Sequence, residues 1–164
     1  MIYLLWDASA LSKRYTPESG SEVVTALFEN KTGAQSVTTI WGYSETFSIL
    51  RRRYNGGAIR QEAFTGALSA LRTEIIESER TMILSIDDEM VLNSLGMIQK
   101  HNLNSTDAAL LVLYLRFRSS VSGSCVLVAA DRRFVRSAIA EGLQAIDTES
   151  FDLADVPKFL ASIL

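Results

Sequence analysis

The chain opens with MIYLLWD at residues 1–7, a short apolar run that ends directly in Asp7. The stretch CVLVAAD at residues 125–131 has the same form and ends in Asp131. A short apolar run without polar alternation is typical of a strand that is buried on both faces of a sheet. The two stretches therefore predict two strands of a covered parallel sheet, each followed by an acidic residue.

Other short apolar runs alternate with longer segments of helical periodicity. We expect strands at residues 2–6, 35–38, 82–86, 125–130 and 144–146. We expect helices at residues 9–15, 19–30, 39–54, 58–78, 88–101, 105–118, 132–141 and 155–163. This alternation predicts an α/β fold in which helices cover a central five-stranded parallel sheet.

The length and composition fit one packed domain. The 164 residues are 48% hydrophobic and 21% charged, with 9 glycines and 2 prolines, which excludes disordered and collagen-like chains. We therefore expect residues 1–164 to form a single domain. The formal charge of −3 argues against a protein that coats DNA or RNA without sequence preference.

The cysteine count and the apolar runs indicate the compartment. Cys125 is the single cysteine, so an internal disulfide is excluded and a reducing compartment is favoured. The first apolar run is too short and too uncharged at its start for a secretory signal. No other apolar run approaches the roughly 20 residues that span a bilayer. We expect a cytoplasmic protein.

Asp7 and Asp131 each follow an expected strand directly. In open parallel sheets, ligands bind beyond the carboxyl ends of the strands, which is where both acids are expected. If the two strands are neighbours, the two carboxylates share one site. Each acid taken alone is also explained as a turn residue or a helix cap.

Two more acids lie on expected helices. Asp107 falls in the first turn of a helix, after Ser105 or Thr106 as the N-cap, where the helix dipole favours an acid in any case. Glu45 lies opposite the apolar face of an earlier helix. Its carboxylate either decorates an exposed surface or projects toward a buried polar site.

Together, these acids and their surroundings resemble the PIN-domain ribonucleases, and most closely the VapC-type toxins of toxin–antitoxin modules. The segments that carry the resemblance are DASAL at residues 7–11, YSE at 43–45, TDAAL at 106–110 and AADRRF at 129–134. They occur in order over nearly the whole chain. The resemblance implies a three-layer α/β/α PIN-like sandwich and a Mg²⁺-dependent endoribonuclease.

The resemblance also implies an acidic metal site that is supported by two hydroxyl groups. Its catalytic and metal-binding residues would be Asp7, Glu45, Asp107 and Asp131, with Ser9 and Thr106 as the nearby hydroxyls. Asp147, just past the last expected strand, either joins this site or belongs to a loop.

Elementary electrostatics supports a metal at such a site. Two unit charges about 4 Å apart at an effective dielectric constant near 20 interact by roughly 4 kcal/mol, against a total stability of about 5–15 kcal/mol. Clustered carboxylates are therefore expected to bind a cation or to retain protons. Oxygen ligands favour Mg²⁺ or Mn²⁺ over zinc. The lone His101 offers no acid–base pair, so metal-activated water is the expected nucleophile.

Basic residues near the acids are candidates for contacts with RNA phosphates. We expect Arg51, Arg52, Arg132 and Arg133 to bind the substrate, and Lys13, Arg14, Arg53 and Arg136 are further candidates. The alternative is that they offset helix dipoles or form solvated surface. Without the four proposed ligands, 15 of the 19 acidic residues remain against 16 basic ones, so the acidic excess is the metal site itself.

The resemblance implies two protein partners, a small antitoxin and a second copy of the chain in a homodimer. The antitoxin would dock along the hairpin of the helices at 39–54 and 58–78. This hairpin offers the aromatic residues Tyr43, Tyr54 and Phe64, which are expected to be exposed.

Three other classes of protein are open. A receiver-like switch domain would need a lysine after the strand at 144–146, and none follows it. A phosphatase of the haloacid-dehalogenase type would need an acid at position 9, which is Ser9. A non-catalytic PIN-like module that binds RNA or a partner would be expected to lack one of the acids, and all four are present.

Overall fold

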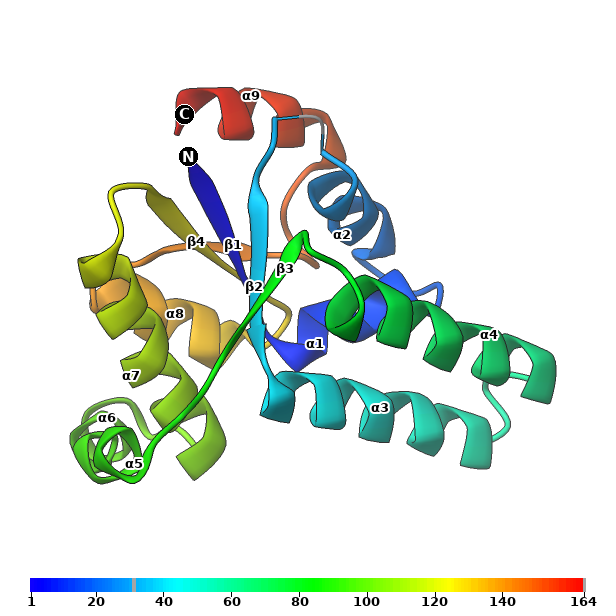
Figure 1. Ribbon diagram of the computed structural model, residues 1–164, viewed down its shortest axis with the longest axis horizontal. Helices are drawn as coiled ribbons and strands as arrows, with labels where there is room; N and C mark the ends of the chain where they lie inside the picture. Colours follow the sequence, from blue (N-terminus) through cyan, green and yellow to red (C-terminus); the bar gives the residue numbers. More distant parts are fainter. Residues whose placement is uncertain (31, 164) are drawn as a thin grey trace.

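The structure is a computed structural model and describes residues 1–30 and 32–163. These residues form one sheet of five parallel strands in the order β3-β2-β1-β4-β5 (Figure 1). The strands are β1 (Ile2–Trp6), β2 (Gln35–Thr39), β3 (Thr81–Leu84), β4 (Ser124–Ala129) and β5 (Gln144–Asp147). The expected α/β class and five-stranded parallel sheet are confirmed.

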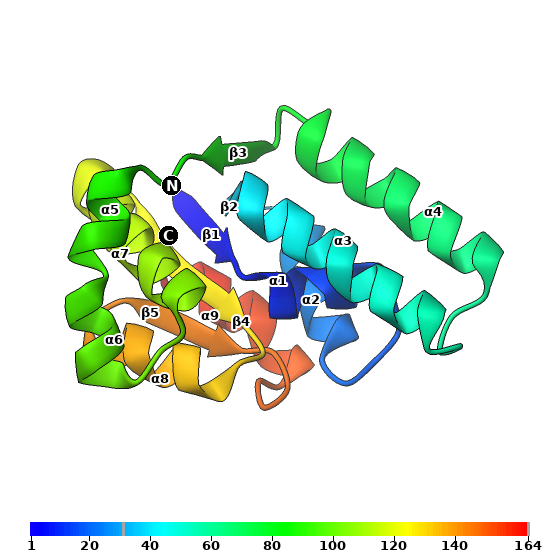
Figure 2. The same cartoon turned by 90° about the horizontal axis from the view of Figure 1, so that it is seen from below.

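Helices cover both faces of the sheet and complete three layers (Figures 1 and 2). One face carries α1 (Ala8–Leu11) with η1 (Ser12–Arg14), α2 (Ser21–Phe28), α3 (Ile40–Asn55), α4 (Gln61–Leu71) with η2 (Arg72–Ile76), and η3 (Leu153–Asp155) leading into α9 (Val156–Ser162). The other face carries α5 (Asp88–Asn93), α6 (Leu95–His101), α7 (Ser105–Ser120) and α8 (Arg132–Ala140).

The two central strands are buried on both faces, as their continuous apolar runs predict. Leu4 and Val126 belong to the hydrophobic core beneath α1–α4, whereas Leu5 and Leu127 belong to the core beneath α7 and α8. Successive side chains of a strand point to opposite faces of the sheet, so a strand between two helical layers needs apolar residues at every position.

The central strands bring the two ends of interest together. Trp6 at the end of β1 pairs with Val128 of β4, and the backbone N–H of Asp7 donates to the carbonyl of Val128 at 3.0 Å. The strands β2 and β3 extend the sheet on one side of β1, whereas β4 and β5 extend it on the other side. The boundary between β1 and β4 is therefore the topological switch point, where open α/β sheets bind ligands. Tyr114 of α7 donates its hydroxyl proton to the carbonyl of Trp6 at 2.7 Å, and this bond fixes α7 against the same strand end.

Three local expectations are wrong. The helix expected at 88–101 is two helices, separated at Ser94, whose hydroxyl donates to the carbonyl of Val91 at 2.7 Å. The N-cap of α7 is Asn104, not Ser105 or Thr106. Phe64 is buried at 8% exposure, because its ring stacks on Tyr54 in the α3–α4 hairpin.

The exposed aromatic side chains of this hairpin are others. Trp41 is 46% exposed and Phe47 is 40% exposed, and both lie on α3.

Among the residues that the structure describes, no helix has the length and apolar character that crossing a membrane requires.

Candidate active site

Asp7 lies at the carboxyl end of β1 and caps α1. Its Oδ2 accepts hydrogen bonds from the backbone N–H of Ser9 at 2.9 Å and from the Ser9 hydroxyl. The residue is only 6% exposed, and burial raises the pKa of its carboxyl group above the ordinary value even though the Ser9 bonds oppose this. Asp7 is thus a desolvated acid that is held in one orientation.

Asp131 occupies the matching position after β4, where it caps α8. Its Oδ1 accepts from the backbone N–H groups of Arg133 at 2.8 Å and Phe134 at 3.1 Å. The cap roles that each acid could have by itself are therefore real. The capping hydrogen bonds use only Oδ2 of Asp7 and Oδ1 of Asp131, because a helix cap needs a single acceptor atom.

Asp107 lies in the first turn of α7, and Asn104 holds its carboxylate in place. The side-chain oxygen of Asn104 accepts from the backbone N–H of Asp107 at 2.8 Å, and its amide donates to Asp107 Oδ2, also at 2.8 Å. Burial first, and then the charges of Asp7, Asp131 and Glu45, raise the pKa of Asp107 from 3.8 to about 7, with Arg133 opposing the shift. The pKa of Asp107 therefore depends on the charges of all three other acids.

Glu45 projects from the middle of α3. The helix begins very close to β2, because a Cβ atom on Gly42 would lie 2.6 Å from the Thr38 hydroxyl oxygen. Burial, followed by the charge of Asp7, raises the pKa of the half-buried Glu45 carboxyl, and Arg52 lowers it. Glu45 thus faces the polar site and is not surface decoration.

The four acids line one cavity of about 500 Å³ at the carboxyl edge of the sheet. The other lining residues are Ala8, Ser9, Ser48, Ile49, Arg52 and Asn104. Within residues 1–30 and 32–163, no three acidic, histidine or cysteine side chains stand close enough together to form a ready-made metal cage. The structure thus brings the four acids to one cavity from four separate elements without converging them on a single point.

The two expected hydroxyl groups differ in their placement. Ser9 lines the cavity. Its hydroxyl oxygen accepts a hydrogen bond from the backbone N–H of Ala130 at 2.9 Å, and its hydroxyl group donates a hydrogen bond to Asp7. Ser9 therefore ties the end of β1 to the end of β4. Thr106 is half-buried beside Asp107, but it is not among the residues that line the cavity.

The four arginines expected to bind the substrate surround the cavity unequally. Arg52 lines it, and Arg133 lies close enough to Asp107 to lower its pKa. Arg132 faces away, with its Nε 3.6 Å from Asp147 Oδ2. The guanidinium of Arg51 lies over the rings of Tyr54 and Phe64, 5.4 and 5.6 Å from their centroids.

Three further basic residues are engaged in structural ion pairs. Lys13 is 4% exposed, and its Nζ donates to Glu149 at 2.9 Å and to the carbonyl of Ser19 at 2.8 Å. Arg53 pairs with Glu18 and donates to the Thr16 hydroxyl group. These contacts tie Lys13 of η1 and Arg53 of α3 to neighbouring loops and favour a structural role over contacts with phosphate.

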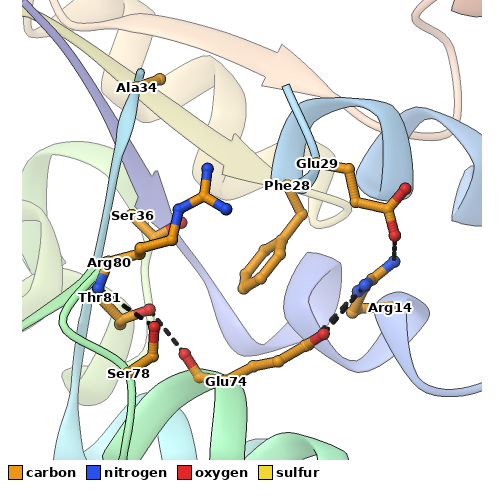
Figure 3. Close-up of a pocket in the computed structure, with 9 residues that line it drawn as sticks. All are labelled: Arg14, Phe28, Glu29, Ala34, Ser36, Glu74, Ser78, Arg80 and Thr81. Carbon is orange, nitrogen blue, oxygen red and sulfur yellow. Dashed lines mark hydrogen bonds and ion pairs between the residues drawn. The ribbon is translucent and has the colours of Figure 1, made fainter. Parts of the chain in front are cut away.

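Arg14 is held in the same way at a separate pocket. Its guanidinium pairs with Glu29 at 2.8 Å and with Glu74 at 2.9 Å, and it lies over the ring of Phe28 (Figure 3). Both glutamates raise the pKa of Arg14. Because two carboxylates already pair with Arg14, its surroundings favour a structural role over a contact with phosphate.

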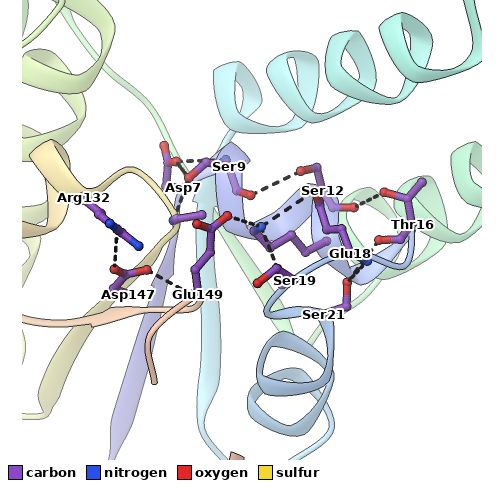
Figure 4. A network of polar contacts seen from close by, with 12 residues as sticks. Asp7, Ser9, Ser12, Thr16, Glu18, Ser19, Ser21, Arg132, Asp147 and Glu149 are labelled. Atoms are coloured by element: carbon purple, nitrogen blue, oxygen red, sulfur yellow. Dashed lines mark hydrogen bonds and ion pairs between the residues drawn. The ribbon is translucent and has the colours of Figure 1, made fainter. Parts of the chain in front are cut away.

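Asp147 does not line the acidic cavity. It ends β5, pairs with Arg132, and accepts from the backbone N–H of Glu149 at 3.0 Å (Figure 4). The loop reading of Asp147 is therefore the one that the structure supports. The polar cavity residues that the sequence did not single out are Ser48 and Asn104. For Asn104 a signal existed, because an asparagine three residues before an acid is typical of a helix N-cap.

The strand order and the covered parallel sheet match a PIN-like α/β/α fold, and the fold is similar to that of two solved structures. VapC20 of Mycobacterium tuberculosis, a toxin that cleaves the sarcin–ricin loop, superposes with a TM-score of 0.61. The two proteins are 16% identical over 88% of this chain and 97% of that one. PAE2754 of Pyrobaculum aerophilum also has a TM-score of 0.61 and 16% identity, over 96% of both chains. No family model and no curated protein sequence matches the chain.

Proposed function

We propose that the protein is a Mg²⁺- or Mn²⁺-dependent endoribonuclease and the toxin of a toxin–antitoxin module. The observation that carries this proposal is the meeting of Asp7, Glu45, Asp107 and Asp131 at one cavity, from four elements far apart in the sequence. A structural role for each acid explains its local bonds. It does not explain why four carboxylates share one cavity in which neighbouring acids raise the pKa values of Asp7, Glu45 and Asp107.

The donor set fits a hard divalent cation. Four carboxylates face the cavity and Arg52 is the only basic side chain that lines it in the described part of the chain, so negative charge is in excess. Asp7, Asp107 and Asp131 would hold the ion, with Glu45 as a direct or water-mediated ligand, and carboxylate oxygens suit Mg²⁺. When bound, the ion would lower the pKa of a water molecule and neutralise the scissile phosphate.

The residues around the acids would prepare them for this task. Ser9 and Asn104 orient the carboxylates of Asp7 and Asp107 through the bonds described above, which reduces the cost of assembling the site. Arg52 acts on the charge of Glu45 and Arg133 on that of Asp107, and both arginines would contact phosphate oxygens of the RNA strand.

The proposed partners follow from the same assignment. A small antitoxin would bind along the α3–α4 hairpin, and the chain would form a homodimer in the cytoplasm. The exposed apolar side chains of Ile40, Trp41 and Phe47 on α3 support a protein partner on this part of the surface. A stable monomer at high protein concentration, measured by light scattering, would contradict the homodimer.

Cleavage of RNA in Mg²⁺ and in EDTA tests the enzymatic proposal. We expect cleavage only with the metal, with 5′-phosphate and 3′-hydroxyl ends on the products, because water attacks phosphorus and the 3′-oxygen leaves with a proton. The variant Asp7→Asn is a second test, because asparagine still caps α1 but lacks the negative charge that would hold the metal. Equal cleavage in EDTA, or equal cleavage by Asp7→Asn, would refute the assignment.

A further inference from the structure

His101, the last residue of α6, is bound to the end of α8. Its ring nitrogen Nε2 lies 2.6 Å from Glu141 Oε1, and Lys100 Nζ donates to the same oxygen at 2.7 Å. The bonds from Lys100 and then from His101 lower the pKa of the Glu141 carboxyl group. An ionised carboxylate only accepts hydrogen bonds, so His101 Nε2 is the donor in this contact, which we call the His101–Glu141 clamp.

The clamp is the shielded part of this cluster. The side chains of His101 and Glu141 are 10% and 16% exposed, whereas that of Lys100 is 62% exposed. A hydrogen bond that is partly removed from water is stronger than one between solvated groups. His101 therefore holds α6 more firmly than Lys100 does.

The turn that follows α8 is a fixed anchor for the clamp. The backbone N–H of Glu141 donates to the carbonyl of Ser137 at 3.1 Å, and the carbonyl of Gly142 accepts from the guanidinium of Arg118 near the end of α7. Leu143 is buried in the core beneath α7 and α8. The turn thus joins the ends of α6 and α7 to α8.

Residues 102–104 connect the clamp to the acidic cavity. Asn102 ends α6 with a φ of 52°, a left-handed conformation that asparagine adopts more readily than most residues. Leu103 is buried in the same core. Asn104 then caps α7, lines the cavity and forms its two bonds of 2.8 Å with Asp107. Three Cα steps span at most about 11 Å, so this connector leaves little slack between the clamp and Asn104.

We propose that His101 is a positioning residue for the acidic site. Its bond to Glu141 fixes the start of the connector, and the connector presents Asn104, which orients the carboxylate of Asp107. His101 does not line the cavity and would act only through these contacts. The inference rests on the proposed function and adds a residue outside the cavity that sets the orientation of one proposed metal ligand.

Four variants separate the bond from the shape of the ring. His101→Leu removes the donor, whereas His101→Gln keeps an N–H group near the position of Nε2. Glu141→Ala removes the acceptor. The matched control is Arg72→Leu, which removes an ion pair of 2.7 Å with Glu77 on the exposed surface of η2.

Hydrogen exchange of the Asp107 backbone amide, followed by NMR in EDTA, reports the positioning without metal or substrate. This amide donates to Asn104, so exchange requires that the bond opens. We expect His101→Leu and Glu141→Ala each to speed its exchange at least about tenfold, and more than that of the fully buried Leu127 in β4. His101→Gln and Arg72→Leu should leave the rate at Asp107 unchanged.

Binding of Mn²⁺, followed by electron paramagnetic resonance, is the second measurement. Loss of an outer-shell partner of a metal ligand typically weakens binding about 10–100-fold. Because His101 lies one contact further out, we expect His101→Leu to weaken Mn²⁺ binding about three- to tenfold and His101→Gln to restore it. The double variant of His101→Leu with Glu141→Ala should be no weaker than either single variant, since both remove the same bond.

Three results would overturn the inference. The first is an unchanged exchange rate at Asp107 in His101→Leu. The second is equal acceleration at Asp107 and Leu127, which would indicate a general loss of stability. The third is a His101→Gln variant that behaves like His101→Leu, which would assign the effect to the packing of the ring. Failure of the proposed function is distinguishable from all three, since it would appear as absence of Mg²⁺-dependent cleavage by the unaltered protein.

Discussion

Replacing Asp107 by asparagine should make the metal-free protein more stable while abolishing cleavage. The pKa of Asp107 is raised from 3.8 to about 7, chiefly by burial and then by three neighbouring carboxylates. At 1.36 kcal/mol for each tenfold change, this shift corresponds to at most about 4 kcal/mol. Because Asp107 is only partly buried and solvent screens its charge, we expect a gain of about 1–2 kcal/mol in the free energy of unfolding.

The same shift determines the dependence of stability on pH. Asp107 binds its proton more tightly in the folded state than in the unfolded state, so its contribution to stability is complete below pH 3.8. That contribution is lost as the pH rises through about 7. Asparagine carries no proton to lose, so Asp107→Asn does not undergo this loss of stability. The difference in the free energy of unfolding between the two proteins should therefore be small at pH 4.5 and largest at pH 8.

Urea unfolding in EDTA at these two pH values is the assay. The matched control is Asp88→Asn at an exposed position of α5, which should change the free energy of unfolding by no more than about 0.5 kcal/mol. Added Mg²⁺ should stabilise the parent protein more than Asp107→Asn, since ligand binding stabilises the folded state. The reasoning is refuted if Asp107→Asn is equally or less stable than the parent at pH 8 in EDTA.

Three further predictions concern catalysis, substrate binding and the core. Asp7→Asn should lower Mg²⁺-dependent cleavage at least about 100-fold with an unchanged circular dichroism spectrum, and a smaller loss would remove Asp7 from the metal ligands. Arg52→Ala should raise KM for RNA more than Arg51→Ala, because Arg52 lines the cavity whereas Arg51 lies on two aromatic rings; equal effects would contradict this distinction. Leu111→Ala should lower the free energy of unfolding by about 2–5 kcal/mol in urea, since Leu111 is fully buried beneath the sheet, and a cost below 1 kcal/mol would contradict this placement.

Much of the architecture could be predicted from local patterns. The strands at 2–6 and 125–130 are recognisable because a strand between two helical layers has no polar face. The positions of Asp7 and Asp131 follow from this, since the residue after a parallel strand lies at the edge where ligands bind. The break at Ser94 was not predictable in this way, because one hydroxyl bond to the backbone interrupts an otherwise periodic segment.

The roles of the basic residues could not be predicted from local sequence patterns. Lys13 follows Asp7 by six residues and Arg132 directly follows Asp131, yet Lys13 is buried in an ion pair with Glu149 whereas Arg132 is 72% exposed beside Asp147. Long charged side chains reach partners from distant parts of the chain, and no spacing along the sequence encodes which partner is within reach. Asn104 was missed for a related reason, since its importance depends on the charge that surrounds Asp107.

By itself, the sequence determined the order of strands and helices, the covered sheet and the acids at its carboxyl edge, because hydrophobic periodicity and helix-end chemistry act over a few residues. Only the tertiary structure decided that β1 and β4 are neighbours, that α3 and α7 bring Glu45 and Asp107 to the same cavity, and which arginines remain free. Those outcomes depend on packing between segments more than a hundred residues apart, since Tyr114 of α7 bonds to Trp6 of β1. The candidate site therefore exists only once the three layers have assembled.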